Sequence, residues 1–259
     1  LVYLNRVGGQ DELAFDGSSF VMHPDGDTVV QMPDWEEALL LTEWERGQDG
    51  WRCVTRQAHA LDPFPADVYP PMMVAVKDYV ARNGFPGVIL GLSGGIDSAL
   101  SAGVAVDALG PDKVWGVMMP SKYTSEASLE DARENARMLG CRHDVVPIVP
   151  AVEAIDQMLP DLTGTAAENV QARLRMVALM ALSNSSGQML LTTGNKSEMS
   201  VGYATLYGDM AGGFSVLKDA YKTTVFALSK WRDRVKPEGA LGPDGPVMPQ
   251  RIITKPPSA

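Results

Sequence analysis

The chain has 259 residues, a formal charge of −10 and 45% hydrophobic residues, which is typical of a folded protein with one core or with one core and a smaller unit. No run of about eighteen apolar residues is present to span a membrane, no secretory leader opens the chain, and no lysine or arginine run offsets the acidic charge, so neither membrane nor nucleic acid is an expected partner. Two separated cysteines and three isolated histidines have no metal-binding spacing, and we expect reduced thiols in a cytoplasmic protein.

The N-terminal segment is expected to be β-structure. Turn dipeptides at Asp16-Gly17 and Asp25-Gly26 separate short β-prone runs, which predicts a β-meander over residues 13–31. A single meander cannot bury both of its faces, so this segment needs a partner. Because the chain also opens abruptly on an apolar run, we expect it to belong to a larger protein.

Residues 43–68 are polar and rich in tryptophan and proline, without helical or strand periodicity. This composition predicts a linker with a domain boundary near residue 58. We therefore expect two parts, residues 1–58 and residues 59–259.

From residue 70 the pattern becomes regular. Expected helices cover residues 72–82, 96–109, 125–139 and 167–183. Expected strands cover residues 88–92, 114–119 and 188–192, and a further strand is expected within residues 141–148. Strands that are apolar throughout and alternate with helices predict a doubly wound parallel sheet covered on both faces. The glycine- and proline-rich residues 232–249 are expected to form a mobile loop.

The most informative segment is a turn between an expected strand and an expected helix, with the sequence Gly91-Leu92-Ser93-Gly94-Gly95-Ile96-Asp97-Ser98. Such a junction directs free N–H groups and the positive end of the helix dipole at one point, which suits a phosphate. Gly94 and Gly95 let phosphate oxygens approach the backbone, and the two serine hydroxyls can add donors. A carboxylate at Asp97 would repel phosphate, so its presence indicates Mg²⁺ between them.

The spacing of this turn excludes two commoner phosphate-binding motifs. No lysine follows the glycines as in GxxxxGK[ST], and the pattern GxGxxG is absent. The structural alternative is a glycine-rich turn with a capping serine. The segment SGGxDS between a strand and a helix is instead typical of the ATP pyrophosphatases, which release pyrophosphate whole and transfer AMP to the substrate.

Several further segments together resemble the glutamine-dependent NAD⁺ synthetases. They are GLSGGIDSAL, AENVQARLR, TTGNKSE, VGYATLYGDMAGG and KDAYKT. The N-terminal VYLNRVGGQDELAFDGSSFV resembles the end of that family's nitrilase-like glutaminase domain, and ITKPPSA resembles its segment before the final tail. The resemblance implies a Rossmann-like, adenine nucleotide alpha-hydrolase-like α/β fold after a short nitrilase-like remnant.

The resemblance also implies ATP-dependent amidation of deamido-NAD⁺. The substrate carboxylate would attack the α-phosphate of ATP, pyrophosphate would leave, and ammonia would convert the acyl-adenylate into NAD⁺ and AMP. Adenylation is needed because a carboxylate is a poor acyl donor, and Mg²⁺ would neutralise charge on the phosphates. The implied partners are ATP, deamido-NAD⁺, ammonia or glutamine, and further copies of the chain in a homo-oligomer.

By motif position, the resemblance assigns site residues to each ligand. The phosphates of ATP would be bound by Gly91, Leu92, Ser93, Gly94, Gly95, Ile96, Asp97 and Ser98, with Thr193 and Lys222. Deamido-NAD⁺ would be bound by Asn169, Arg173, Glu198, Tyr203, Ala204, Thr205 and Leu206. Mg²⁺ would be bound by Asp97 and Glu198, Asp97 and Lys222 would serve catalysis, and Ser121 and Lys122 would lie near the nucleotide.

Some of these residues have a structural alternative. Glu198 could cap a helix, and Arg173 could pair with a surface carboxylate. Tyr203 and Tyr207 could be core aromatics.

The resemblance leaves the ammonia source outside this chain. In the family, a nucleophilic cysteine that hydrolyses glutamine precedes a segment like residues 1–20, whereas Cys53 and Cys141 lie elsewhere, so the chain is expected to use free ammonia. Two alternatives stay open. One is another ATP pyrophosphatase, either a GMP-synthetase-like amidotransferase or a thiolase, which would need paired cysteines and a basic face. The other is a non-catalytic nucleotide-binding module.

Overall fold

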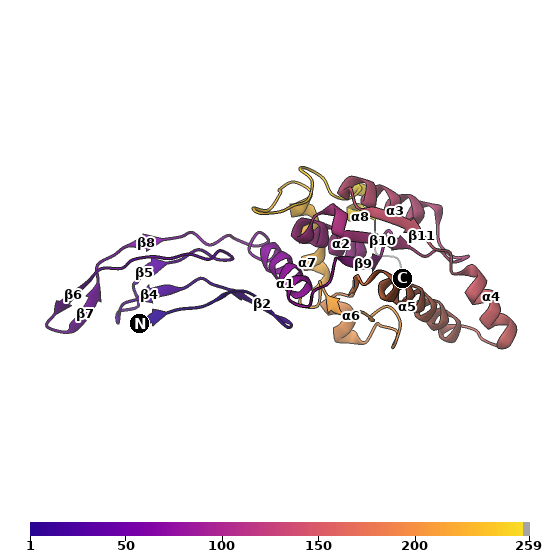
Figure 1. Cartoon of the computed structure of the whole chain (residues 1–259), viewed down its shortest axis with the longest axis horizontal. Helices are drawn as coiled ribbons and strands as arrows, with labels where there is room; N and C mark the ends of the chain where they lie inside the picture. Colours follow the sequence, from indigo (N-terminus) through magenta and orange to yellow (C-terminus); the bar gives the residue numbers. More distant parts are fainter. Residues whose placement is uncertain (256–259) are drawn as a thin grey trace. The chain divides into compact units, whose positions relative to one another are not determined.

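The computed structural model describes residues 1–255, and the chain divides into two compact units, Leu1–Tyr79 and Val80–Ala259 (Figure 1). The first unit is mainly β-structure around a small core of Val21, Val29, Val30 and Cys53. Its four-stranded sheet has the order β1 (Val2–Tyr3), β4 (Phe20–Met22), β5 (Thr28–Gln31) and β8 (Gln57–Ala58). Two hairpins, β2 (Val7–Gln10) with β3 (Leu13–Asp16) and β6 (Trp44–Gly47) with β7 (Gly50–Cys53), precede helix α1 (Tyr69–Arg82).

The predicted meander is correct in its strands and partly wrong in its pairing. β4 and β5 form the expected antiparallel pair. β3 pairs with β2 instead of β4, and β4 pairs with β1 on its other edge. The partner that the meander needs is thus supplied in part by residues 1–10.

The predicted linker is wrong, because residues 43–68 contain the hairpin β6–β7 and the strand β8. The hairpin pairs Trp44 with Cys53 and Gly47 with Gly50. Most of its side chains are exposed, so its strands lack the apolar alternation that marks a half-buried strand. The one local signal is Asp49-Gly50, a turn dipeptide like those that predict the meander.

The second unit is built on a five-stranded sheet in which every neighbouring pair of strands is parallel. The strand order is β11 (Arg142–Val145), β10 (Val114–Met118), β9 (Val88–Gly91), β12 (Met189–Thr192) and β13 (Phe214–Ser215). The helices are α2 (Ile96–Leu109), α3 (Glu126–Leu139), α4 (Val149–Met158), α5 (Thr165–Ser186), α6 (Lys196–Val201), α7 (Lys222–Arg232) and α8 (Gln250–Thr254), with a 3₁₀ turn at Pro111–Lys113. This confirms the predicted parallel α/β sheet.

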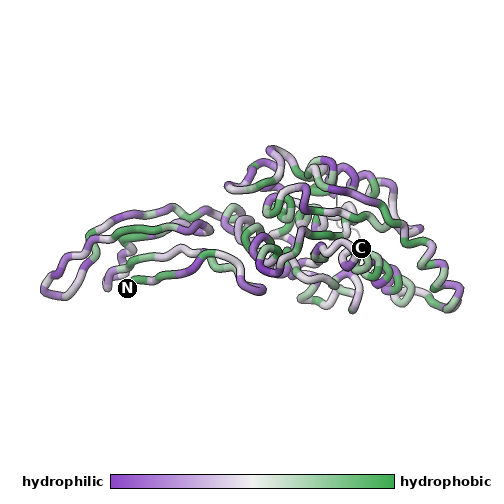
Figure 2. Tube along the Cα trace, in the orientation of Figure 1, coloured by the Kyte–Doolittle hydropathy of each residue, from purple (hydrophilic) through white to green (hydrophobic). Residues whose placement is uncertain are grey.

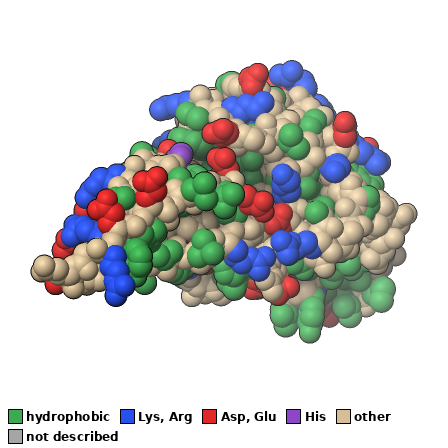
Figure 3. Space-filling model, turned by 60° about the vertical axis from the view of Figure 1, so that its left-hand side comes forward, with side chains coloured by type: hydrophobic (Ala, Val, Ile, Leu, Met, Phe, Trp, Pro, Cys, Tyr) green, Lys and Arg blue, Asp and Glu red, His purple; other side chains and the backbone are tan. Residues whose placement is uncertain are grey.

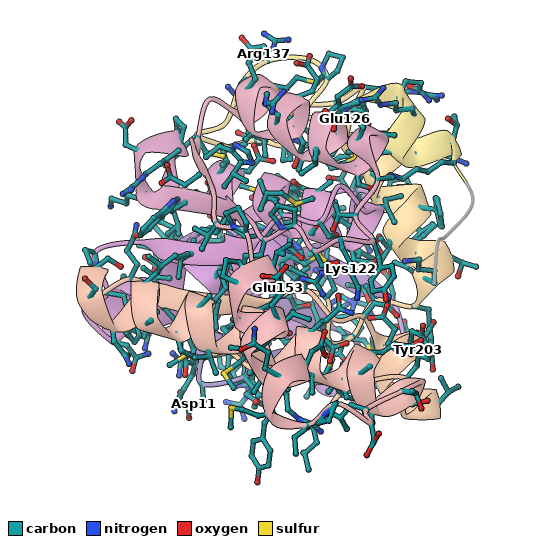
Figure 4. All side chains as sticks on the ribbon, turned by 90° about the vertical axis from the view of Figure 1, so that its right-hand side faces the viewer. Asp11, Lys122, Glu126, Arg137, Glu153 and Tyr203 are labelled. Atoms are coloured by element: carbon teal, nitrogen blue, oxygen red, sulfur yellow. The ribbon has the colours of Figure 1, made fainter. Side chains whose placement is uncertain are left out.

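Helices cover both faces of the sheet, as its apolar strands predict (Figure 2). Figure 4 shows α3, which carries Glu126 and Arg137, on one side of the sheet and α5 on the other. On the α5 side, Leu179 packs in a buried cluster with Ile89, Trp115 and Leu190. α2 packs against α3, α7 and α8, which explains why nearly all of its residues are buried.

The strand order places a topological switch point between β9 and β12. The chain runs from β9 through β10 to β11 on one side, then returns to β12 and β13 on the other. At such a point the connections leave in opposite directions, and ligands bind in the crevice outside the carboxyl ends of the two strands. The turn Gly91–Ser98 follows β9, and the TTGNKSE segment follows β12.

The loop after α7 is anchored instead of mobile as predicted. The side chain of Arg232 is fully buried and forms two hydrogen bonds with the carboxylate of Asp107, at 2.6 and 2.9 Å. The same guanidinium donates to the carbonyls of Pro243 and Gly245. The loop therefore closes around a buried ion pair whose anionic partner lies on α2.

The surface of the described residues is mixed in character. On the face shown in Figure 3, Lys and Arg side chains lie among Asp and Glu side chains. Within residues 1–255, no helix combines the length and the apolar character that crossing a membrane requires.

Candidate active site

The turn after β9 has the geometry of a phosphate loop. Gly94 has φ of +74°, and a Cβ there would lie 2.4 Å from the carbonyl oxygen of Ser128, so only glycine fits. Ser93 Oγ accepts from the Gly95 N–H at 3.2 Å, and Ser98 Oγ accepts from the Ser93 N–H at 3.2 Å and donates to the Gly95 carbonyl at 3.0 Å. The two serine hydroxyls, which were predicted to donate to a ligand, therefore also stabilise the loop through hydrogen bonds within it.

A cavity of about 1060 Å³ opens at the switch point in front of this loop. All eight residues of the turn, Gly91, Leu92, Ser93, Gly94, Gly95, Ile96, Asp97 and Ser98, line it. Thr193, Glu198, Tyr203 and Lys222, which lie far along the chain, line it too. The volume is at the upper end of the range of small-molecule sites, so two nucleotide-sized ligands are compatible with it.

Asp97 is where three segments of the chain meet. Its Oδ1 accepts from Asn195 Nδ2 at 2.9 Å, and its Oδ2 accepts from Lys222 Nζ. Asn195 follows β12 and Lys222 begins α7. The side chains of Asp97 and Lys222 are 18% and 27% exposed, so this ion pair is partly shielded but open to the cavity.

Glu198 caps α6 and lines the cavity at the same time. Its Oε2 accepts from the Asn195 N–H at 3.0 Å, while Asn195 Oδ1 accepts from the Glu198 N–H at 3.1 Å, which makes a capping box. Burial raises the pKa of Glu198, and the nearby charge of Asp97 raises it further. Glu198 therefore caps a helix, as the structural alternative proposed, and its side chain also lines the cavity.

Asp97 and Glu198 together fit a magnesium ion. Both offer carboxylate oxygens to one cavity, and oxygen ligands are those that Mg²⁺ prefers. The effect of Asp97 on the pKa of Glu198 shows that the two charges repel one another, and a cation between them would relieve this repulsion. Two protein carboxylates with phosphate oxygens are the usual environment of Mg²⁺ in nucleotide sites.

The residues predicted to bind deamido-NAD⁺ form a loop and its support. Asn169 Oδ1 accepts from Thr205 Oγ1 at 2.9 Å, and Arg173 Nε donates to the Leu206 carbonyl at 3.0 Å. Asn169 and Arg173 therefore share one face of α5, as their spacing predicts, and there they hold the segment Tyr203–Leu206. Of the seven residues predicted to bind deamido-NAD⁺, Glu198 and Tyr203 line the cavity and the other five do not.

Tyr203 and Tyr207 are 63% and 72% exposed, so the alternative that they are core aromatics is wrong. The predicted alternative for Arg173, pairing with a surface carboxylate, is replaced by its bond to a backbone carbonyl. These exposed rings are available to a ligand or to another protein surface.

Ser121 and Lys122 lie beside the cavity without lining it. The Ser121 N–H donates to Thr124 Oγ1 at 2.9 Å, and Lys122 Nζ lies 5.1 Å from the centre of the Tyr123 ring. Tyr123 and Thr124, the next residues along the chain, do line the cavity. The cavity therefore reaches the residues that follow Ser121 and Lys122, and the expected position of these two near the nucleotide stays a prediction.

Several cavity residues were not assigned from the sequence, and three of them, Asn195, Arg175 and Lys255, have polar side chains that bond to other parts of the fold. Asn195 lies within the TTGNKSE segment, and its burial and bond to Asp97 could not be read from spacing. Arg175, two residues after Arg173 on α5, donates to the Met119 carbonyl at 3.1 Å, and burial lowers its pKa. Lys255 reaches the phosphate loop from the ITKPPSA segment, whose residues 256–259 lie outside the described part of the chain.

The fold and this cavity define a doubly wound α/β protein with a glycine-rich strand–helix turn at the switch point of its sheet. The family model for NAD synthase matches residues 69–259. The chain belongs to the NAD synthase family, which confirms the resemblance seen in the sequence.

Comparisons with individual proteins agree. The chain is 51% identical over 264 residues to the glutamine-dependent NAD(+) synthetase of Acinetobacter baylyi, covering all of this chain and 47% of that protein. It resembles the structure of the glutamine-dependent NAD⁺ synthetase from Acinetobacter baumannii in complex with ADP, with a TM-score of 0.86 and 49% identity over 98% of this chain and 47% of that one. It also resembles the NMN synthetase from Francisella tularensis, with a TM-score of 0.67 and 31% identity over 76% of each chain. The chain spans about half the length of the curated relatives it matches.

Proposed function

We propose that this chain is the synthetase part of an enzyme that converts deamido-NAD⁺ to NAD⁺ with ATP. The observation that carries the proposal is the cavity at the switch point. There the phosphate loop, the carboxylates of Asp97 and Glu198, and the ammonium of Lys222 face one space. Membership of the NAD synthase family supplies the reaction class.

In the first step, the carboxylate of deamido-NAD⁺ attacks the α-phosphorus of ATP. The bond from the α-phosphorus to the bridging oxygen breaks, and pyrophosphate leaves with the bonding electrons. We propose that the N–H groups of the first turn of α2 and the ammonium of Lys222, which belong to residues that line the cavity, bind the leaving pyrophosphate. Asp97 orients Lys222, and the cavity holds both anionic substrates in reach of one another.

We propose that Asp97 and Glu198 hold Mg²⁺ when the nucleotide is bound. The ion would neutralise charge that develops on the phosphate oxygens. Lys222 would then exchange part of its contact with Asp97 for contacts with phosphate. Because Asn195 bonds to both carboxylate residues, it would fix their spacing.

In the second step, ammonia attacks the carbonyl carbon of the acyl-adenylate. A C–N bond forms, the C–O bond to AMP breaks, and the nitrogen loses a proton to give the amide. We propose that the ammonia comes from glutamine in the intact protein, and that residues 1–58 are the end of a nitrilase-like glutaminase domain. The names of the matched relatives, which cover all of this chain, support that origin.

We also propose that the protein is cytoplasmic and forms a homo-oligomer. Both cysteines are free, which suits a reducing compartment. Val201, Leu206 and Tyr207 are each at least 70% exposed and lie within one short segment, which suits a surface covered by another copy.

An assay of AMP formation tests the proposal. Purified protein with ATP, Mg²⁺, ammonia and deamido-NAD⁺ should release equal amounts of AMP and pyrophosphate and form NAD⁺. Nicotinic acid mononucleotide is the comparison substrate, because one similar structure is an NMN synthetase, and xanthosine monophosphate tests the GMP-synthetase-like alternative. Failure to form AMP with deamido-NAD⁺ would contradict the proposal, and so would faster turnover of either comparison substrate.

A further inference from the structure

Lys255, just after the short helix α8, reaches the phosphate loop from the far end of the chain. Its Nζ donates to the carbonyl of Gly94 at 2.7 Å and to Asp131 Oδ2 at 2.9 Å. The side chain is 32% exposed and lines the cavity. Ile252 and Ile253 are buried, so α8 holds the base of this lysine in place.

The contact with Gly94 fixes one peptide plane of the loop. In a planar trans peptide the C=O and the following N–H point in opposite directions. The Gly94 carbonyl points at Lys255, so the Gly95 N–H points back into the loop, where it donates to Ser93 Oγ. Between two glycines the opposite orientation has little steric cost, and it would turn a carbonyl oxygen toward the bound phosphate.

Asp131 fixes the lysine in turn. Its carboxylate, on α3, is only 1% exposed and accepts from Lys255 and from Arg251 Nε. α3 also carries Ser128, whose carbonyl leaves no room for a side chain at Gly94. Gly94 therefore lies close against the Ser128 carbonyl of α3. Its own carbonyl accepts from Lys255, which Asp131 of the same helix holds in place.

Arg251 provides an internal comparison. It binds the same carboxylate of Asp131 and also Glu130, with a side chain that is 49% exposed. It does not line the cavity. Removing Arg251 therefore takes a cation from Asp131 and leaves the contact between Lys255 and the Gly94 carbonyl in place.

We propose that Lys255 is a positioning residue that holds the Gly94–Gly95 peptide in the phosphate-binding orientation. This deepens the proposed function, on which it rests for the identity of the anion. The ammonium prevents the Gly94 carbonyl from turning toward the pyrophosphate end of ATP. It links the C-terminal helix, α3 and the loop through one buried carboxylate.

The test compares Lys255→Met with Arg251→Met in the intact protein. Calorimetric titration with inorganic pyrophosphate and Mg²⁺, and separately with ATP, measures binding without turnover. Because a hydrogen bond from a charged donor is lost, Lys255→Met should weaken both affinities by about 10-fold or more. Arg251→Met should change them by no more than about 2-fold, because Arg251 does not line the cavity and Lys255 still pairs with Asp131 in this variant.

Steady-state kinetics distinguish a positioning role of Lys255 in ATP binding from a general loss of structure in the variant. Lys255→Met should raise KM for ATP and leave KM for deamido-NAD⁺ unchanged. Wild-type affinity in a folded Lys255→Met variant would overturn the proposal, and so would equal weakening in Arg251→Met. If wild-type protein binds ATP but amidates no nicotinate substrate, the proposed function fails while the binding comparison still decides the role of Lys255.

A crystal structure of the wild-type protein with pyrophosphate keeps the proposal falsifiable even if Lys255→Met does not fold. The Gly94 carbonyl should still point at Lys255 Nζ, with the anion on the opposite side of that peptide. A carbonyl turned toward the anion, or Lys255 withdrawn from it to bind the anion directly, would overturn the proposal.

Discussion

At the scale of single residues, Asp97 and Glu198 each have a structural role in the fold and a second, chemical role that we propose. Asp97 joins the β12 loop and α7 to the phosphate loop through Asn195 and Lys222. Glu198 closes the capping box of α6 with one oxygen. Because capping needs only a hydrogen-bond acceptor whereas metal binding needs charge, the two roles can be separated by substitution.

Replacing Asp97 with alanine should abolish turnover and preserve the fold. The change removes one proposed Mg²⁺ ligand and leaves Lys222 without its carboxylate, so we expect AMP formation to fall by about 10²- to 10³-fold or more. The AMP assay measures the loss, and thermal unfolding checks the fold. Asp219→Ala is the matched control, because Asp219 is 81% exposed and pairs only loosely with Lys196, at 3.4 Å. Substantial activity in folded Asp97→Ala protein would refute the metal role.

Replacing Glu198 with glutamine should keep the cap and remove the charge. Glutamine at this position can still accept from the Asn195 N–H, so the melting temperature should change little. We expect the Mg²⁺ concentration for half-maximal turnover to rise by about 10-fold, since one carboxylate ligand is lost. An unchanged requirement for Mg²⁺ would show that Glu198 only caps the helix.

The requirement for Mg²⁺ should also depend on pH in the wild-type protein. Burial and the charge of Asp97 raise the pKa of Glu198, so its carboxylate takes up a proton at a higher pH than an ordinary glutamate. A protonated carboxyl binds Mg²⁺ poorly. As pH falls toward the acidic range, the half-saturating Mg²⁺ concentration should therefore rise earlier than for an unperturbed glutamate. Titrations of activity against Mg²⁺ at several pH values measure this, and the rise should be smaller in Glu198→Gln.

At the scale of elements, the helix and strand predictions were most accurate where buried residues give the sequence a regular apolar pattern. The bounds expected for α2 agree with the structure, and those expected for α3 differ by one residue, because Ser125 is its N-cap. α4 was not predicted, because Pro150 in its first turn is typical of a loop as well as of a helix start. The exposed hairpin β6–β7 had no apolar pattern to reveal it.

The site residues show the same difference: groups within one turn could be predicted from the sequence, whereas contacts between distant segments could not. Residues adjacent in one turn, such as Gly94, Gly95 and Asp97, could be grouped from the sequence because the strand–helix junction brings their groups together. The contact of Lys255 with Gly94 spans 161 positions and depends on how α8 and α3 pack, which no local pattern encodes. The support of the Tyr203–Leu206 segment by Asn169 likewise needed the fold.

The ion pair between Asp107 and Arg232 should be the main anchor of the loop at residues 232–249. Arg232→Met would leave the carboxylate of Asp107 buried without its cation and free two loop carbonyls of their donor, so unfolding free energy should fall by about 3–5 kcal/mol. Denaturant unfolding measures the loss. Lys236→Met, which breaks an exposed pair with Asp244 in the same loop, should cost no more than about 1 kcal/mol. Equal losses in the two variants would contradict the anchoring role.

At the scale of the whole molecule, the two units differ in the size of their hydrophobic cores. The second unit has a continuous core on both faces of its sheet, whereas the first packs a few side chains around Val21 and Val30. The first unit also contains a cavity of about 680 Å³ among its own residues, lined by apolar side chains such as Val2, Phe20 and Leu40. A unit with so small a core is expected to gain stability from further protein packed on it.

The source of ammonia is a property of the whole molecule, and the two cysteines allow a direct test. Burial raises the pKa of Cys141 to about 11, so near neutral pH almost all of this thiol is protonated and the thiolate that attacks an amide is scarce. Cys53 is buried in the core of the first unit, where its Sγ donates to the Thr55 carbonyl. Neither thiol is therefore placed to hydrolyse glutamine.

A protein made of these 259 residues should consequently form NAD⁺ with ammonium salts and show no turnover with glutamine. The measurement is AMP release at equal concentrations of the two nitrogen donors, with free ammonia removed from the glutamine stock. A Cys141→Ala variant should keep the ammonia-driven rate, because the thiol lies outside the cavity and takes no part in amidation. Glutamine-driven turnover that vanishes in Cys141→Ala would mean that the surroundings of this thiol change on substrate binding, and the ammonia source would then lie within the second unit.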